Sequence, residues 1–151
     1  MGRRKKQELR KWESDADSSW KYTDAFGKKR TDSFCMIFSS LLESAAFTDL
    51  SARQRILYIL CVSQCYGKRK PGKDFRDIDE FQGEDVFYLN WREVSERYKL
   101  SGYSSENSSR FYADMRALES HGFVKQICSG KPQHKKSVWQ LDWHWRVWQR
   151  P

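Results

Sequence analysis

Between residues 90 and 141, hydrophobic residues recur first with the spacing of a helix and then with the spacing of a strand. The helical spacing occurs over residues 90–98 and again over about 104–121, and a short turn at 99–103 that contains a glycine separates the two stretches. The apolar stripes of these helices are Trp91, Val94 and Tyr98 in the first and Phe111, Met115 and Leu118 in the second. Gly122 follows where a left-handed residue ends a helix. The pattern therefore predicts two helices joined by a tight turn.

The strand spacing occupies residues 123–128 and 137–141, on either side of a basic loop at 129–136. These two segments predict a β-hairpin with a cationic tip. The short apolar run at 86–89 predicts a further strand, which we expect to join the hairpin as a third member. Helix, turn, helix and hairpin in this order predict an α+β fold, a winged helix-turn-helix with a helical core and a small antiparallel β wing.

The chain before this region predicts additional helices. An apolar run at 33–38 marks the beginning of the folded unit, and Ser40 with Glu43 has the spacing of a capping box that opens a short helix through Ala46. Ser51 with Gln54 repeats that spacing, and the following helix is apolar nearly all round, so we expect it to be the central buried helix, ending at Gly67. A polar stretch at 68–85 follows, whose scattered acidic residues lack the spacing of a calcium loop. Asn90 is expected to cap the next helix.

Few apolar residues occur in residues 1–33, which predicts a flexible basic N-terminal tail before a domain at 34–151. Basic residues cluster at 3–11, so the tail is either a solvated segment or an arm that contacts phosphates. Its four aromatic residues are unexplained by either interpretation, and we expect some of them to dock onto the domain.

The charge of the chain favours a polyanionic partner. The 151 residues include 28 lysines and arginines against 20 aspartates and glutamates, a net charge of +8. No apolar run approaches the ~20 residues of a membrane span, and no apolar signal core follows the N-terminus. We therefore expect a cytoplasmic protein without membrane contact.

Candidate chemistry is sparse. Cys61 and Cys65 share one face of the predicted central helix, where they are either the beginning of a metal site or two small buried residues. The three histidines are isolated, no finger-type spacing occurs, and no nucleotide-binding glycine loop is present. The sequence predicts no metal, no cofactor and no enzymatic activity.

The face of the second helix opposite its apolar stripe predicts a contact with DNA. Short hydroxyls and alanine allow close approach to a major groove, and arginine reads guanine. The residues expected on this recognition helix are Ser104, Ser105, Ser109, Arg110, Ala113 and Arg116, with the first two at its start, where backbone N–H groups bind phosphate. The residues expected to contact DNA from the wing are Lys125, Lys131, His134, Lys135 and Lys136. Further phosphate contacts are expected from Arg3, Arg4, Lys5, Lys6, Lys68, Arg69 and Lys70.

A series of short motifs in residues 34–128 resembles a known family. The motifs are Phe34-x-x-Ile37, Leu41-Leu42-Glu43-Ser44, Phe47-x-x-Leu50-Ser51, Leu57-Tyr58 and Leu118-Glu119-x-x-Gly122-Phe123-Val124. Their order resembles the winged-helix N-terminal domain of the replication initiator protein A family of Gram-positive plasmids and integrative elements. Members of that family usually continue into further domains. Small winged-helix proteins of conjugative elements also serve as origin-binding accessory factors or as repressors.

Together these patterns predict a double-stranded DNA-binding protein of a mobile genetic element, which recognises an origin of replication or transfer as an initiator or relaxosome accessory factor. The alternatives are a winged-helix transcriptional repressor and a winged helix that binds a protein. Replication or transfer machinery would be further partners. The C-terminal tryptophans Trp139, Trp143, Trp145 and Trp148 have three interpretations, of which the first places Trp139, Trp143 and Trp145 on one strand face. They cover the sheet, stack on unpaired bases, or form an apolar homodimer patch.

Overall fold

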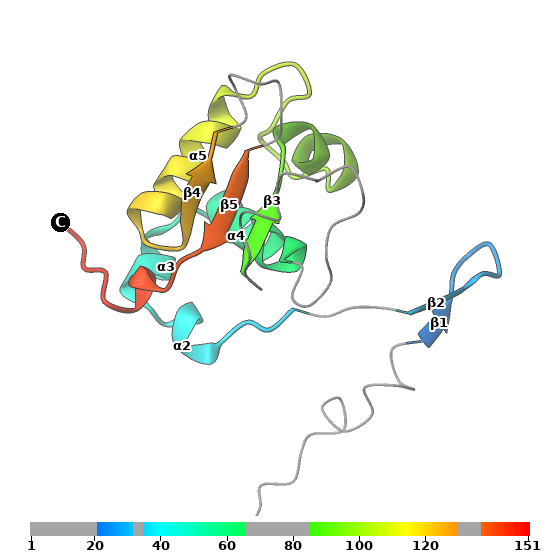
Figure 1. The fold of residues 1–151 in the computed structure, drawn as a ribbon, viewed down its shortest axis with the longest axis horizontal. Coiled ribbons are helices and arrows are strands. Elements are labelled where there is room, and N and C mark those ends of the chain that lie inside the picture. Colours follow the sequence, from blue (N-terminus) through cyan, green and yellow to red (C-terminus); the bar gives the residue numbers. More distant parts are fainter. Residues whose placement is uncertain (1–20, 32–34, 66–84, 130–136) are drawn as a thin grey trace, which may run out of the picture. The chain divides into compact units, whose positions relative to one another are not determined.

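Contacts along the chain divide it into two units, residues 1–35 and 36–151. The computed structural model describes residues 21–31, 35–65, 85–129 and 137–151 (Figure 1). In the first unit the described part is a β-hairpin of strands β1 (Lys21–Thr23) and β2 (Lys29–Thr31). The Asp24 carboxylate closes its turn by accepting hydrogen bonds from the backbone N–H groups of Phe26 and Lys28 at 3.0 and 2.9 Å. The sequence predicted only a flexible tail here, so the hairpin is new.

The second unit begins with three helices, α2 (Ser39–Leu42), α3 (Ala45–Asp49) and α4 (Ala52–Gln64). The capping box predicted at Ser51 and Gln54 is confirmed, because both of its hydrogen bonds form. The single helix predicted from Ser40 through Ala46 is wrong. Ser44 has extended backbone and its hydroxyl accepts from the Phe47 N–H at 3.1 Å, so a new helix begins after it.

The remaining elements of the described ranges are three strands and three helices. They are β3 (Val86–Tyr88), the helical turn η2 (Glu93–Arg97), α5 (Ser109–Ser120), β4 (Val124–Cys128), β5 (Val138–Leu141) and the 3₁₀ helix η4 (His144–Arg146). The strands form an antiparallel sheet of order β3-β5-β4. The prediction that the strand at 86–89 joins the hairpin as a third member is therefore confirmed. Mixed helix and antiparallel sheet also confirm the α+β class.

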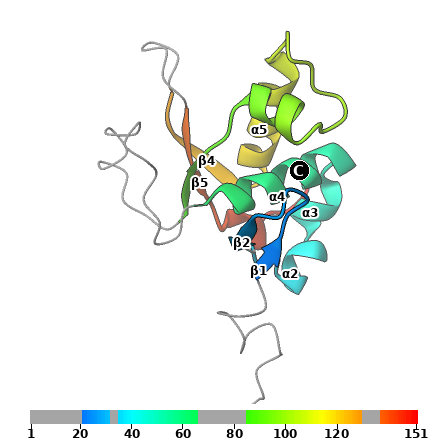
Figure 2. The ribbon, with the colours of Figure 1, turned by 90° about the vertical axis from the view of Figure 1, so that its right-hand side faces the viewer.

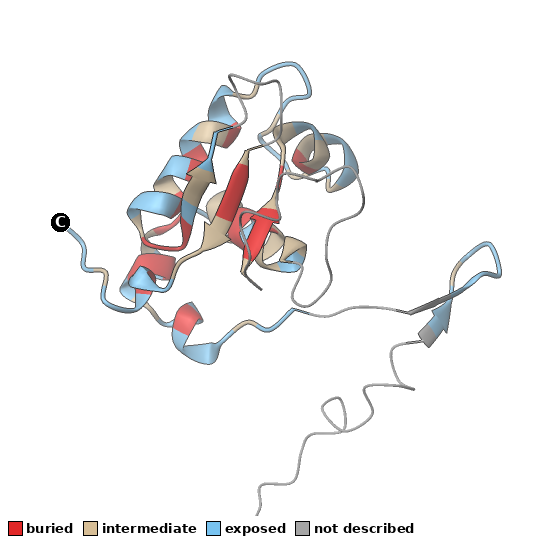
Figure 3. Cartoon of the chain, viewed as in Figure 1, coloured by how far each residue is buried: buried red, intermediate tan, exposed pale blue. Residues whose placement is uncertain are grey.

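The core lies between the sheet and the helices, which lie against one of its faces (Figures 1 and 2). Strand pairing sets Phe87 opposite Trp139, and both side chains are buried in the core. The fully buried helical residues include Leu57 and Cys61 of α4 and Phe111, Met115 and Leu118 of α5, so the apolar stripe predicted for α5 is confirmed (Figure 3).

Helix α4 is less buried than its sequence predicted. Leu57, Tyr58 and Cys61 are buried, whereas Ile56 is 46% exposed and Leu60 and Val62 are half-buried. The helix thus buries one face and leaves apolar side chains on another. Its last residue is Gln64, and the expected stop at Gly67 lies outside the described residues.

The sequence placed Trp139, Trp143 and Trp145 on one strand face, and this prediction is wrong. Strand β5 ends at Leu141, and the Asp142 carboxylate accepts hydrogen bonds from the N–H groups of Trp143 (2.7 Å) and His144 (3.4 Å). This local capping turns the chain into η4. Trp139 and Trp145 are core residues, whereas Trp143 is 40% exposed.

Candidate nucleic-acid interface

Helix α5 presents the solvent face that the sequence predicted for DNA contact. Ser109, Arg110, Ala113 and Arg116 are all exposed, on the side away from the buried stripe. The helix follows the turn at 99–103 and precedes β4. The four residues share one helix and combine two arginines with two short side chains.

The two serines expected at the start of this helix lie outside it. Helix α5 begins at Ser109, so Ser104 and Ser105 belong to the preceding loop, where both are exposed. The Ser104 hydroxyl accepts from the Glu106 N–H at 3.1 Å, and the Asn107 side chain accepts from the Ser109 N–H at 2.9 Å. Such side-chain bonds to the nearby backbone compete with helix formation, which explains the late start. The prediction that Ser104 and Ser105 lie at the N-terminus of this helix is therefore wrong.

Both arginines are anchored to backbone and still exposed. Arg110 donates from Nη1 to the Gly102 carbonyl oxygen at 3.1 Å, which fixes it beside the turn. Arg116 donates from Nε to the Tyr112 carbonyl oxygen at 3.3 Å, one turn earlier in α5. A guanidinium has five N–H donors, so each arginine retains donors for a ligand.

A buried carboxylate connects α5 to the turn and to α4. Asp114 is 4% exposed and accepts from Arg53 Nε at 2.7 Å, Tyr103 Oη at 2.6 Å and Gln54 Nε2 at 2.9 Å. Burial alone would raise the pKa of Asp114, but the hydrogen bonds from Arg53, Tyr103 and Gln54 outweigh it and hold this pKa below its usual range. The carboxylate therefore stays charged and orients α5 against α4.

Sequence reasoning missed Asp114. The available signal was its position on the inner stripe of the helix, three residues after Phe111 and next to Met115. A charged residue is rarely buried without a partner. Its presence on that stripe therefore indicated that cationic or hydroxyl donors must approach from another element. The sequence alone did not identify Arg53 and Tyr103 as those donors.

The first of the two predicted helices is confirmed as a short helix over residues 91–97, of which Glu93–Arg97 is η2. The Asn90 side chain accepts from the Glu93 N–H at 2.8 Å, as predicted for its cap. Val94 is buried, and Trp91 and Tyr98 pack against the core, so this stripe is confirmed. The exposed basic residues of this region are Arg92, Arg97 and Lys99, of which Arg97 pairs with Glu93. This region adds cationic groups next to α5 in the sequence.

The far end of α5 is fixed by backbone and side-chain contacts. Gly122 has φ of 77°, and the Gly122 and Phe123 N–H groups donate to the carbonyls of Glu119 and Leu118 at 3.0 and 2.9 Å. This confirms the predicted left-handed stop. A Cβ at Gly122 would lie 2.6 Å from the Cβ of His144, so η4 packs directly on the glycine.

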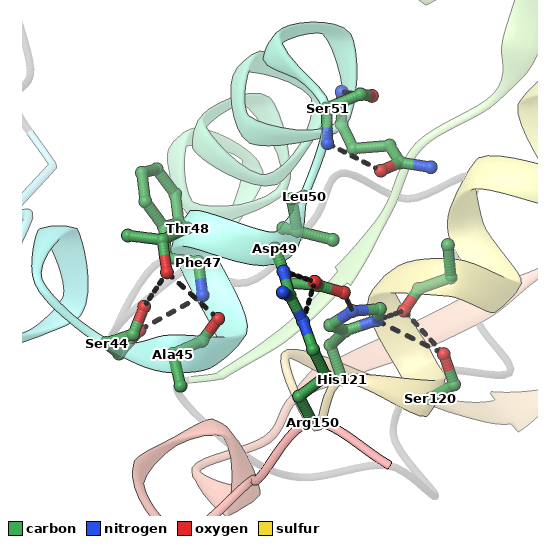
Figure 4. A network of polar contacts seen from close by, with 12 residues as sticks. Ser44, Ala45, Phe47, Thr48, Asp49, Leu50, Ser51, Ser120, His121 and Arg150 are labelled. Carbon is green, nitrogen blue, oxygen red and sulfur yellow. Dashed lines mark hydrogen bonds and ion pairs between the residues drawn. The ribbon is translucent and has the colours of Figure 1, made fainter.

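His121, the last residue before that glycine, joins α5 to α3 and the C-terminal segment (Figure 4). Its Nδ1 lies 2.7 Å from the Ala117 carbonyl oxygen and its Nε2 lies 2.9 Å from Asp49 Oδ2. Arg150 donates to the other Asp49 oxygen, and Trp148 stacks on the His121 ring at 4.5 Å. Hydrogen bonds from His121 and Arg150 lower the pKa of Asp49. These contacts hold the C-terminal segment against α3 and α5.

Only part of the predicted wing is described. Lys125 is exposed on β4, where it lies opposite Gln140 of β5. The expected DNA contacts Lys131, His134, Lys135 and Lys136 lie outside the described residues. The same holds for the expected phosphate contacts Arg3, Arg4, Lys5, Lys6, Lys68, Arg69 and Lys70.

The cysteines are placed as single thiols. Cys65 donates from Sγ to the Cys61 carbonyl oxygen at 3.6 Å, and burial raises the pKa of the Cys61 thiol. Within residues 21–31, 35–65, 85–129 and 137–151, no three His, Cys, Asp or Glu side chains gather as metal ligands would. In the same ranges, no helix is both long enough and apolar enough to cross a bilayer.

Comparisons with protein-family models, with curated proteins and with solved structures found no match to this chain.

Proposed function

We propose that residues 36–151 form a winged helix that binds double-stranded DNA. Helix α4, strand β3, the η2 turn, helix α5 and the β4–β5 pair follow one another in the order predicted for such a domain. The sheet order β3-β5-β4 brings the strand before η2 into the hairpin that would carry the wing. The observation that carries the proposal is the solvent face of α5, where the exposed Arg110 and Arg116 share one helix with the short side chains of Ser109 and Ala113.

The dimensions of α5 suit a major groove. Its 12 residues span about 18 Å at 1.5 Å per residue, and a major groove about 12 Å wide admits one helix. Ser109 and Ala113 would let the helix backbone approach the bases closely. Arg110 and Arg116 would then contact guanine O6 and N7 through their remaining donors.

Asp114 supports this role from inside the fold. Its hydrogen bonds to Arg53 and Tyr103 tie the recognition helix to α4 and to the turn that also receives Arg110. A helix held on two sides enters a groove at a defined angle, which base reading requires.

Basic residues outside α5 would supply most of the sequence-independent affinity. Lys125 is exposed, and the sequence adds lysines at 131, 135 and 136 to the same hairpin. Each lysine that neutralises a phosphate releases condensed counterions and strengthens binding at low salt.

The biological role that we propose is recognition of an origin of replication or transfer on a mobile genetic element, in the cytoplasm and together with replication or transfer proteins. It rests on the resemblance of residues 34–128 to the replication initiator protein A family. Footprinting across the DNA that flanks the encoding gene tests it. Protection at a replication or transfer origin supports the proposal, whereas protection confined to a promoter would assign the protein as a repressor.

A winged helix that binds a protein is the rival function. A titration with random duplex at low salt separates the two, because a net charge of +8 and a DNA-docking face should give measurable nonspecific binding. A duplex affinity that is absent at low salt would reject DNA binding.

A further inference from the structure

An exposed arginine lies on a cluster of three aromatic rings at the C-terminal side of the second unit. The guanidinium carbon of Arg146 lies 4.9 Å from the centre of the Trp143 ring, 5.3 Å from that of Trp145 and 6.0 Å from that of Phe38. Phe38 and Trp143 also meet edge to face, with ring centres 6.0 Å apart. We refer to Phe38, Trp143 and Arg146 as the aromatic–arginine cluster.

The fold holds this cluster at the surface through Trp145. That ring is 2% exposed and stacks on Phe123 at 6.3 Å, while its backbone N–H donates to the Gly122 carbonyl oxygen at 3.1 Å. In a 3₁₀ helix, residues three apart lie on the same side. With Trp145 fixed in the core, Trp143 and Arg146 therefore share one side of η4.

The rings and the charge of the cluster remain available to a ligand. Phe38 and Trp143 are 41% and 40% exposed, although aromatic rings of this size are usually covered. Arg146 is exposed and forms no ion pair or side-chain hydrogen bond with any residue in the described ranges. An aromatic platform beside a guanidinium that has no ion-pair partner among the described residues suits a ligand with both a flat ring and an anion.

We propose that the aromatic–arginine cluster binds single-stranded DNA, with an unpaired base stacked on Trp143 or Phe38 and the adjoining phosphate on Arg146. Stacking on aromatic side chains with a cationic contact to the backbone is how proteins hold single strands. The net charge of +8 favours such a polyanion over an apolar peptide. This inference rests on the proposed function, since it takes nucleic acid as the ligand.

The aromatic–arginine cluster lies near the C-terminal end of the helix that we propose to bind duplex DNA. Gly122, at the C-terminal end of α5, packs on η4, whereas Arg110 lies in the first turn of the same helix. Along the helix axis, Arg110 and Arg116 are therefore about 18 Å and about 9 Å from Gly122, at 1.5 Å per residue. A protein that binds duplex along α5 and a single strand beyond the C-terminal end of that helix would hold a junction between paired and melted DNA.

The test is binding of the full chain to a fluorescein-labelled oligodeoxythymidine of about 12 nucleotides, within the range of known single-strand sites. Trp143→Leu keeps apolar volume but removes the stacking ring, so we expect a loss of about 5- to 150-fold in affinity. Trp143→Phe keeps a ring and should retain most of the affinity. Arg146→Gln should weaken binding and lower its salt dependence.

Matched controls keep the outcomes distinct. Ile56→Ala removes another exposed apolar side chain, on α4, and should bind like the wild type. Circular dichroism melting verifies that each variant is folded. Duplex affinity, measured in parallel, should fall in the double variant Arg110→Ala/Arg116→Ala and stay unchanged in Trp143→Leu.

Each contrary result has its own meaning. If the wild type binds duplex but Trp143→Leu binds the single strand equally well, the inference is overturned and the proposed function stands. If the wild type binds neither form, the proposed function fails and the inference with it. If sedimentation shows a self-association that Trp143→Leu abolishes, and no single strand binds, the cluster is a protein contact and the inference is wrong.

Discussion

Gly122 and Asp114 illustrate, at the residue scale, how single positions fix the helix that we propose to bind DNA. Gly122 ends α5 in a left-handed conformation and leaves room for the backbone of η4. Asp114 collects donors from α4 and from the turn at 99–103. Both residues act through contacts with segments that are distant in the sequence, so their variants should change stability in ways that local propensity does not explain.

Gly122→Ala should destabilise the fold more than Gly102→Ala. Both glycines have positive φ, 77° and 94°, so alanine is strained at either position. A Cβ at Gly122 would lie 2.7 Å from the Trp145 backbone nitrogen, whereas at Gly102 it would lie 3.0 Å from the flexible Arg53 side chain. We expect an additional loss of about 1–3 kcal/mol for Gly122→Ala, measured by urea unfolding. Equal losses would show that η4 can move away from the glycine.

Asp114→Asn should lower the free energy of unfolding at neutral pH. The variant should then lose less stability than the wild type when the pH is lowered. The folded-state pKa of Asp114 is lowered, so its contribution is fully present above the ordinary carboxyl pKa of about 3.9 and is lost as the pH falls through the lower folded value. We expect a cost of roughly 1–3 kcal/mol near neutrality, a figure that allows for the partly exposed Arg53 partner. Unfolding free energies of wild type and variant should therefore converge below about pH 4. A constant difference across that range would assign the effect to packing rather than charge.

At the scale of elements, hydrophobic periodicity predicted the helices and strands that bury one regular face. It failed where side chains form hydrogen bonds with the nearby backbone. The α5 stripe, the β4–β5 pair and the third strand follow from spacing, because a buried face requires it. The predicted start of α5, at about residue 104, is several residues before the observed start at Ser109. The side chains of Ser104 and Asn107 accept hydrogen bonds from backbone N–H groups two residues further on, and these bonds compete with the helix. The β1–β2 hairpin has strands of three residues, too short for alternation to be recognised.

The face of α5 is tested by Arg110→Ala and Arg116→Ala. Each should weaken binding to the cognate site by about 1–3 kcal/mol, because a lost bidentate contact leaves guanine unread. Binding to random duplex should weaken less. Fluorescence anisotropy on both duplexes measures the two losses, and Ser120→Ala, at the C-terminal end of the same helix, is the control. Equal losses on both duplexes would remove base reading from α5.

The basic hairpin is tested by changing Lys131, Lys135 and Lys136 together to alanine. These residues lie outside the described ranges, and the prediction rests on their charge in the sequence. If each contacts one phosphate, the slope of log K against log salt should flatten by up to about 2.7, at about 0.9 per contact. The loss should be nearly uniform across sequences, since phosphates carry no base identity. An unchanged slope would show that these lysines do not contact phosphates, and the basic residues at 3–11 or 68–73 would then be the better candidates.

At the scale of the whole molecule, the second unit holds α5 at its middle, through Asp114, and at its C-terminal end, and leaves one face of the helix exposed. Arg53, Gln54 and Tyr103 fix the helix through Asp114, and the contacts of Gly122 and His121 fix its end. A helix fixed in this way and carrying exposed arginines is suited to docking as a rigid body. The central claim is therefore that duplex DNA meets this face of α5.

The most direct measurement of that claim is a titration of the ¹⁵N-labelled chain with a duplex, followed through backbone amide chemical shifts. We expect the largest changes at Ser109, Arg110, Ala113 and Arg116, with the amides of the buried Leu57 and Cys61 nearly unchanged. Shifts that are absent at low salt, or that spare α5 while other residues respond, would contradict it.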